Sequence, residues 1–113
     1  MCAHEDLINK VMRNELGMVG AVISDGDTVF DFVGGHNYSK TPAEAAGAAL
    51  NAGCDQSWDM NLPPANRMGD PNGTVAKALQ QNLTTLDAIH TSAANTLRQR
   101  FRVGLYDNPN STK

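Results

Sequence analysis

The chain has 113 residues, and this length suggests one domain, because domains most often run to about 100–150 residues. Nine basic against twelve acidic residues leave a formal charge of −3, which argues against a nucleic-acid partner, since nucleic-acid binders usually carry a basic face. The composition, 41% hydrophobic and 19% charged, is not that of a disordered chain. No apolar run approaches the roughly 18 residues of a membrane span, so we expect no membrane partner.

Few residues in the chain point to disulfides, metals or export. Cys2 and Cys54 allow at most one internal disulfide, and the sequence leaves open whether they pair. His4, His36 and His90 lack metal-ligand spacing, so we expect neither a metal nor another cofactor. The first residues lack the basic-then-apolar order of a signal peptide.

The N-terminal third predicts a helix followed by a strand. Apolar residues recur at helical spacing over 3–16, Arg13 lies among the polar residues of the opposite side, and Gly17 suits the helix end. Residues 19–23 form a short continuous apolar run, typical of a strand buried on both faces in a parallel sheet. Residues 28–34 fit either a short helix or an apolar loop.

The next helix has a well-defined start. Thr41 can act as the cap, Pro42 suits the first helical position, and Glu44 stands where a capping box requires it. The alanine-rich stretch 43–52 follows and ends at Gly53. Residues 53–55 could form a short second strand.

Residues 56–73 contain several prolines and glycines and predict a long loop. A short helix is expected over 74–82, and a longer one over 85–103 with Thr84 as its cap and Gly104 at its end. The apolar stripe expected on the longer helix comprises Leu86, Ile89, Ala93, Leu97 and Phe101. Residues 108–113 read as a tail or linker.

The order of these elements implies a parallel α/β fold. Strands followed by helices are typical of βα units. Two strands cannot form a stable sheet without partners, so the pattern predicts part of a larger α/β structure that is mostly helical by content.

Several short motifs occur in an order that resembles glycoside hydrolase family 3, whose members include β-glucosidases and β-xylosidases. They are Ser24-Asp25 after the predicted strand, Thr41-Pro42-Ala43-Glu44 at the helix start, Ala52-Gly53-Cys54-Asp55, and the segment 100–107. The approach to the strand, residues 7–20, is similar as well. The resemblance covers residues 2–109.

The resemblance implies that residues 1–107 are a partial domain, the last two βα units of a (β/α)8 barrel. Asp25 is then the catalytic nucleophile of a retaining β-glycosidase, at the carboxyl end of the seventh strand, where barrel enzymes carry their chemistry. The expected partners are β-linked glycosides or oligosaccharides. Four Asn-x-Ser/Thr sequons, at Asn37, Asn72, Asn82 and Asn110, suggest a secreted parent protein, as many relatives are.

The same resemblance predicts that this chain alone is inactive. A full barrel takes about 250 residues. The family's acid/base commonly comes from a later domain or from an earlier histidine-containing loop. Glu5, Glu15 and Glu44 are the in-chain candidates for this role, but they fall on predicted helices, which lie outside the barrel.

Each candidate residue also has a simpler interpretation. Asp25 could be an ordinary turn carboxylate, and Asp27 reads as a solvated turn residue. We expect Asp55 to have a structural turn role, His36 to be an exposed loop residue, and His90 to be packed or at the edge of the last helix.

Two positions depart from the family pattern. Gly26 replaces a residue that is often Trp or Cys in relatives, and Gln56 stands where an apolar residue is expected. The first difference leaves the aglycone contact, and with it the substrate choice, open.

The alternative function is a non-catalytic, helix-rich interaction protein. In that case the first, alanine-rich and last helices would expose apolar faces, which promote association.

Overall fold

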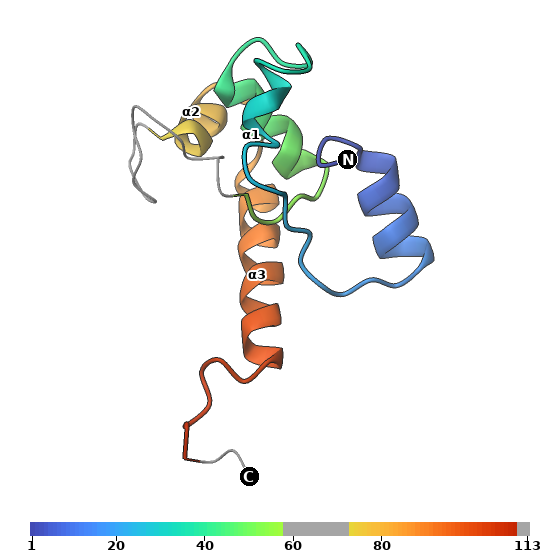
Figure 1. Cartoon of the computed structure of the whole chain (residues 1–113), viewed down its shortest axis with the longest axis vertical. Helices are drawn as coiled ribbons and strands as arrows, with labels where there is room; N and C mark the ends of the chain where they lie inside the picture. Colours follow the sequence, from blue (N-terminus) through green and yellow to red (C-terminus); the bar gives the residue numbers. More distant parts are fainter. Residues whose placement is uncertain (58–72, 111–113) are drawn as a thin grey trace.

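The computed structural model describes residues 1–57 and 73–110. In chain order its elements are η1 (Asp6–Glu15), η2 (Phe30–Phe32), α1 (Pro42–Asn51), α2 (Thr74–Gln80) and α3 (Leu86–Arg102). Figure 1 shows α1 and α2 gathered around the upper part of α3, with η1 to one side. Most of the predicted loop 56–73, and the last three residues of the predicted tail, lie outside the described residues.

Helix α1 forms the centre of the packing and begins as predicted. The Thr41 hydroxyl accepts a hydrogen bond from the Glu44 N–H at 3.2 Å, and the Glu44 carboxylate accepts one from the Lys40 N–H at 2.7 Å. Six of its residues are buried: Ala43, Ala45, Ala46, Gly47, Ala49 and Leu50. The alanine-rich helix therefore does not expose an apolar face, which corrects that part of the interaction-protein expectation.

Small residues on α1 let its neighbours approach closely. A Cβ at Gly47 would lie 2.6 Å from the backbone oxygen of Leu83, which connects α2 to α3. Since real Cβ atoms do not approach backbone this closely, glycine is required where α1 meets that connection. Helix α1 also contacts η2 and α3.

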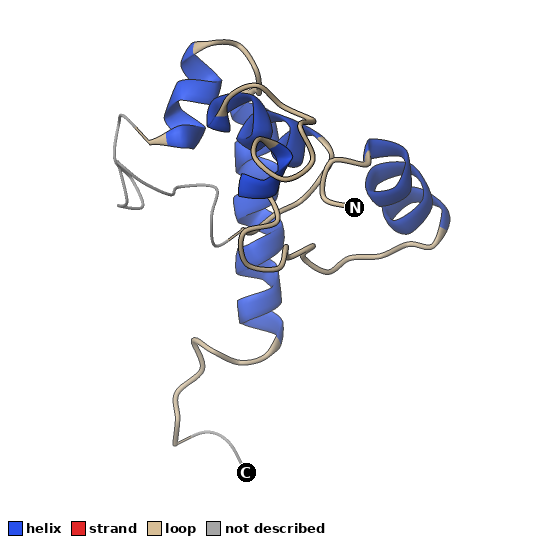
Figure 2. Cartoon of the chain, turned by 45° about the horizontal axis from the view of Figure 1, so that its top comes forward, coloured by secondary structure: helices blue, strands red, loops and turns tan. Residues whose placement is uncertain are grey.

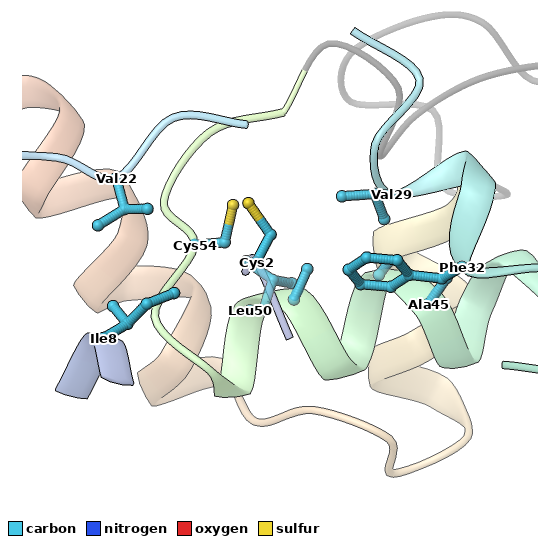
Figure 3. Packing of buried hydrophobic residues seen from close by; sticks show 10 residues of the cluster. Cys2, Ile8, Val22, Val29, Phe32, Ala45, Leu50 and Cys54 are labelled. Carbon is cyan, nitrogen blue, oxygen red and sulfur yellow. The ribbon is translucent and has the colours of Figure 1, made fainter. Parts of the chain in front are cut away.

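The hydrophobic core collects residues from the first half of the chain around α1. Figure 3 shows Cys2 and Leu50 in the middle of this core, with Ile8, Val22 and Cys54 on one side and Val29, Phe32 and Ala45 on the other. The cluster comprises Cys2, Ile8, Val22, Val29, Phe32, Ala45, Ala46, Ala49, Leu50 and Cys54. Residues 28–34, left open between helix and loop, include the short 3-10 helix η2, which contributes Phe32 to the core.

The predicted strands are wrong as regular strands. In the described part of the chain no strand forms, and Figure 2 contains only helices and loops. What remains is one parallel bridge between Ile23 and Gln56. Val19 and Ile23 are more than half exposed, so the segment 19–23 is not buried on both faces. The physical reason is that a strand needs several consecutive residues paired with a neighbouring segment, and within the described residues the run 19–23 makes one bridge.

The first helix differs from the prediction in its winding. Helix η1 is a π-helix, in which residues five apart bond and therefore share a face. This winding aligns Arg13 with the buried Ile8, whereas the expected α-helical spacing put Arg13 on the solvent side. The correction matters because Arg13 contacts the segment around Asp55.

The last helix differs in its cap and in its buried face. The Thr85 hydroxyl, not that of Thr84, accepts the capping hydrogen bond from the Ala88 N–H at 3.1 Å. Thr84 is buried and donates to the Asn51 side chain at 2.8 Å. Of the apolar stripe, Leu86, Leu97 and Phe101 are exposed, so the last helix exposes an apolar face as expected, while the buried residues of α3 are Ser92 and Asn95.

The three predicted glycine stops are confirmed. Gly17, Gly53 and Gly104 all have positive φ, of 67°, 89° and 72°. None of the described helices has the length and apolarity needed to cross a membrane.

Candidate active site

Asp25 lies in the turn that follows the paired segment Val22–Ser24. Its carboxylate accepts a hydrogen bond from the Gly26 N–H at 2.8 Å, and its backbone oxygen accepts one from the Ser24 hydroxyl at 3.0 Å. Ser24 is buried while Asp25 is exposed. The turn therefore holds the Asp25 backbone and leaves its carboxylate open to a ligand.

Two segments far apart in sequence pair in parallel just before this turn. The N–H of Asp55 donates to the Val22 oxygen at 2.8 Å, and the N–H of Ser24 donates to the Gln56 oxygen at 2.8 Å. These bonds are the start of a parallel ladder, and Asp25 comes directly after its carboxyl end. The pair resembles the end of two neighbouring strands, although it is too short to count as a sheet.

The Asp55 side chain connects the two paired segments to the rest of the molecule through hydrogen bonds. One carboxylate oxygen accepts from the Val22 N–H at 2.7 Å and from the Arg13 guanidinium at 2.5 Å. The other accepts from the Asn95 side-chain amide at 2.9 Å. Both oxygens of a carboxylate that is only 1% exposed are thus satisfied, as a buried charge requires.

The partners of Asp55 are themselves well fixed. Arg13 also donates to the backbone oxygens of Gly20 and Gly53, at 3.1 and 3.2 Å. The Ser92 hydroxyl on α3 donates to the Asp55 backbone oxygen at 2.6 Å. Asp55 therefore links η1, the segment leading to Asp25, and α3, which confirms a structural role and extends it well beyond a turn.

The other acidic candidates lie in ordinary structural settings. Glu44 is committed to capping α1 through the Lys40 N–H, and Glu5 and Glu15 are exposed at the ends of η1. Asp27 is exposed with a φ of 59°, in agreement with its interpretation as a solvated turn residue. None of these contacts marks a second catalytic carboxyl group.

The histidines do not form a site with Asp25. His36 is exposed, as expected, and lines an open groove of about 500 Å³ with Phe32, Tyr38 and the first residues of the chain; Asp25 is not among the lining residues. His90 is exposed on α3. Within residues 1–57 and 73–110, no three His, Cys, Asp or Glu side chains gather as metal ligands would.

Sequence reasoning missed the residues that hold Asp55, namely Arg13, Ser92 and Asn95. One signal was available, because Ser92 and Asn95 are three apart and share a face of α3, so polar residues interrupt the side of the helix that meets the core. A buried aspartate also requires a cation or several donors nearby. No local pattern identifies which arginine supplies the charge.

Comparisons with known proteins connect this geometry to glycosidases. No family model matches the chain. The chain is 30% identical over 106 residues to β-D-xylosidase 1 of Arabidopsis thaliana, covering 94% of this chain and 12% of that protein. It is 29% identical over 112 residues to a probable β-glucosidase C of Aspergillus flavus, covering 91% of this chain and 16% of that protein.

A solved structure has a similar fold. A β-glucosidase from Erythrobacter marinus, EmGH1, superposes with a TM-score of 0.75 and 27% sequence identity, over 96% of this chain and 13% of that one. The resemblance to β-glucosidases and β-xylosidases is therefore confirmed. The chain spans between about an eighth and a sixth of the length of these relatives.

Proposed function

We propose that this chain is the nucleophile-bearing part of a retaining β-glycosidase of family 3, with Asp25 as the nucleophile. One observation carries the proposal: Asp25 is exposed directly past the carboxyl end of a parallel pair that a buried, fully bonded Asp55 holds in place. The similarity to β-xylosidases and β-glucosidases over nearly the whole chain supports the same assignment.

The paired segments are proposed to be the ends of neighbouring strands in a (β/α)8 barrel. Barrel enzymes carry their catalytic residues at the carboxyl ends of parallel strands, which is where Asp25 lies. The exposed faces of Val19 and Ile23 support this placement, because apolar side chains beside a strand edge are what a neighbouring barrel strand covers.

The reaction needs two carboxyl groups with different roles. In a retaining enzyme one carboxylate attacks the anomeric carbon, and an acid roughly 5–5.5 Å away protonates the leaving oxygen. Asp25 supplies the first group. We assign the second to the parent protein beyond these 113 residues, since Glu44 is committed to a helix cap and Glu5 and Glu15 lie on η1. The chain by itself is accordingly proposed to be inactive.

Export of the parent protein is part of the proposal. Asn37 and Asn82, the acceptors of two sequons, are exposed and lie outside the helices with φ of 52° and 56°. Surface asparagines in loops are the sites that glycosylation in a secretory pathway requires.

The direct test is a chimera. Residues of this chain replace the aligned 106-residue segment of β-D-xylosidase 1, and hydrolysis of aryl β-xylosides and β-glucosides is measured. Asp25→Asn is expected to reduce kcat by about 10⁴-fold, the scale of losing a nucleophile. Asp27→Asn is the matched control, because Asp27 is an equally exposed carboxylate two residues away, and it is expected to stay within about threefold of the parent chimera.

Equal effects of the two substitutions, or an active Asp25→Asn chimera, would contradict the assignment. Circular dichroism and thermal unfolding first establish that the chimera folds. If the chimera with the full replacement does not fold, a second chimera that carries only residues 19–27 of this chain is tested in the same way. It contains fewer foreign contacts.

A further inference from the structure

Cys2 and Cys54 meet in the core although they are far apart in the sequence. Figure 3 shows their sulfur atoms side by side, each side chain directed toward the other. Cys2 is 3% exposed and Cys54 fully buried, and no disulfide joins them. Cys2 belongs to the segment that precedes η1, and Cys54 immediately precedes Asp55.

We propose that Cys2 and Cys54 are a cross-linking site, at which oxidation forms a disulfide that ties the N-terminal segment to the segment holding Asp55. The contact between the two thiols carries this inference, since a disulfide forms without large backbone movement only where the two side chains already face each other. It does not depend on the proposed glycosidase function.

The electrostatics of the pair agree with this geometry. A side-chain hydrogen bond between the Cys54 thiol and Cys2, and then burial, raise the pKa of Cys54 well above its ordinary value, and the nearby charge of Asp55 acts in the same direction. The Cys54 thiol is therefore neutral at neutral pH. Exchange is correspondingly slow there, because the thiolate is the attacking species.

Two neighbouring cysteines could also be ligands of a metal ion. Structural zinc needs four ligands, and no third His, Cys, Asp or Glu joins the two thiols in the part of the chain that the structure describes. The Cys54 thiol also donates to the carbonyl oxygen of Gln56 at 3.8 Å. The arrangement of the two thiols therefore favours a disulfide over a tetrahedral metal site.

The oxidant is a low-molecular-weight disulfide such as oxidised glutathione. One cysteine thiolate attacks it to give a mixed disulfide and releases one glutathione thiolate. The second cysteine thiolate then attacks the cysteine sulfur of the mixed disulfide, forming the Cys2–Cys54 bond and releasing the second glutathione. The two cysteines lose two electrons and two protons, and two molecules of reduced glutathione are formed.

The bond would secure the region on which Asp25 depends. It closes a loop of about 50 residues, which restricts the unfolded chain more than the folded one. Its position beside Asp55 means that it also keeps the N-terminal segment packed against the parallel pair.

The test measures the equilibrium between this chain and a glutathione buffer at about pH 8, approached from both the reduced and the oxidised chain. The quantity is the effective concentration of one thiol for the other, in native buffer and in urea sufficient to unfold the chain. We expect the native value to exceed the unfolded one by about 100-fold, the range of a native disulfide. Cleavage with trypsin without reduction should give peptide 1–10 joined to peptide 41–67.

Cys2→Ser and Cys54→Ser are the controls, and each should abolish the joined peptides. A native effective concentration no greater than the unfolded one would overturn the proposal. So would recovery of both cysteines as separate glutathione adducts, or a disulfide between two copies of the chain.

Discussion

The surroundings of α1 and the second half of α3 differ sharply in how completely they are packed. Around α1, alanines, Cys54 and the charged group of Asp55 are buried, and each carboxylate oxygen of Asp55 has partners. Along the end of α3, by contrast, Leu97 and Phe101 are 44% and 63% exposed. Figure 1 shows this end of α3 projecting away from the other helices.

The difference indicates which contacts the chain makes for itself. The polar face of α3, with Ser92 and Asn95, is satisfied by Asp55, while Leu97 and Phe101 on its apolar face remain largely exposed. An exposed apolar face of this kind marks an interaction site. This division is expected of a segment that buries one side on itself and turns the other toward further parts of a barrel.

The largest expected effect comes from the packed region. Asp55→Ala leaves the Arg13 guanidinium, the Val22 N–H and the Asn95 amide without their acceptor, and breaking such a pair costs about 3–5 kcal/mol. Because that is comparable with the whole stability of a small domain, we expect cooperative urea unfolding to disappear.

The matched control is Asp25→Ala, which removes an exposed carboxylate from the neighbouring segment. Its unfolding free energy should change by no more than about 0.5 kcal/mol. If the two alanine substitutions change the unfolding free energy equally, the contrast between a buried, hydrogen-bonded Asp55 and an exposed Asp25 is wrong.

A smaller effect concerns pH. The side-chain hydrogen bond with Cys2 and then burial raise the pKa of Cys54 above its ordinary value of 9.0, so the neutral thiol is favoured in the folded chain. The resulting stability is fully present below pH 9 and is lost as the pH rises, because the unfolded chain ionises first. Under reducing conditions, unfolding free energy should fall between pH 9 and 10 by about 1 kcal/mol more in the wild type than in Cys54→Ala. Parallel pH profiles for the two chains would refute this account of the thiol.

The smallest effect on stability is expected on the open face. Replacing Leu97 with Gln and Phe101 with Ser should change the unfolding free energy by about 0.5 kcal/mol or less, because both side chains are exposed. Self-association should fall by at least about threefold in sedimentation velocity, since the apolar face is reduced. A wild-type chain that stays monomeric at every concentration would show that this face needs no partner.

The parts of the fold that depend on local chemistry were predictable. The cap of α1 follows from Thr41, Pro42 and Glu44 within a few residues of one another, and Gly17, Gly53 and Gly104 end helices because they adopt positive φ. The one-residue shift of the α3 cap, from Thr84 to Thr85, arises because both residues are competent caps and Thr84 instead bonds Asn51.

The features that depend on distant residues were not predictable in this way. The run 19–23 has strand character, but a strand forms only when several consecutive residues pair with a neighbouring segment, and Gln56 supplies one bridge. Arg13 lies on the polar side of an ideal α-helix, and the π winding of η1 turns it toward Asp55. The role of Asp25 depends on the rest of an active site, so the sequence yields it as a family resemblance only.

The central claim is that Asp25 attacks the sugar. It is tested most directly by treating the folded xylosidase chimera with a 2-deoxy-2-fluoro β-glycoside, which slows release of the glycosyl-enzyme. After digestion with trypsin, we expect the fluorosugar on the peptide 14–40, with fragmentation locating it at Asp25. A fluorosugar on Asp27, Asp31 or a residue outside this peptide would contradict the account.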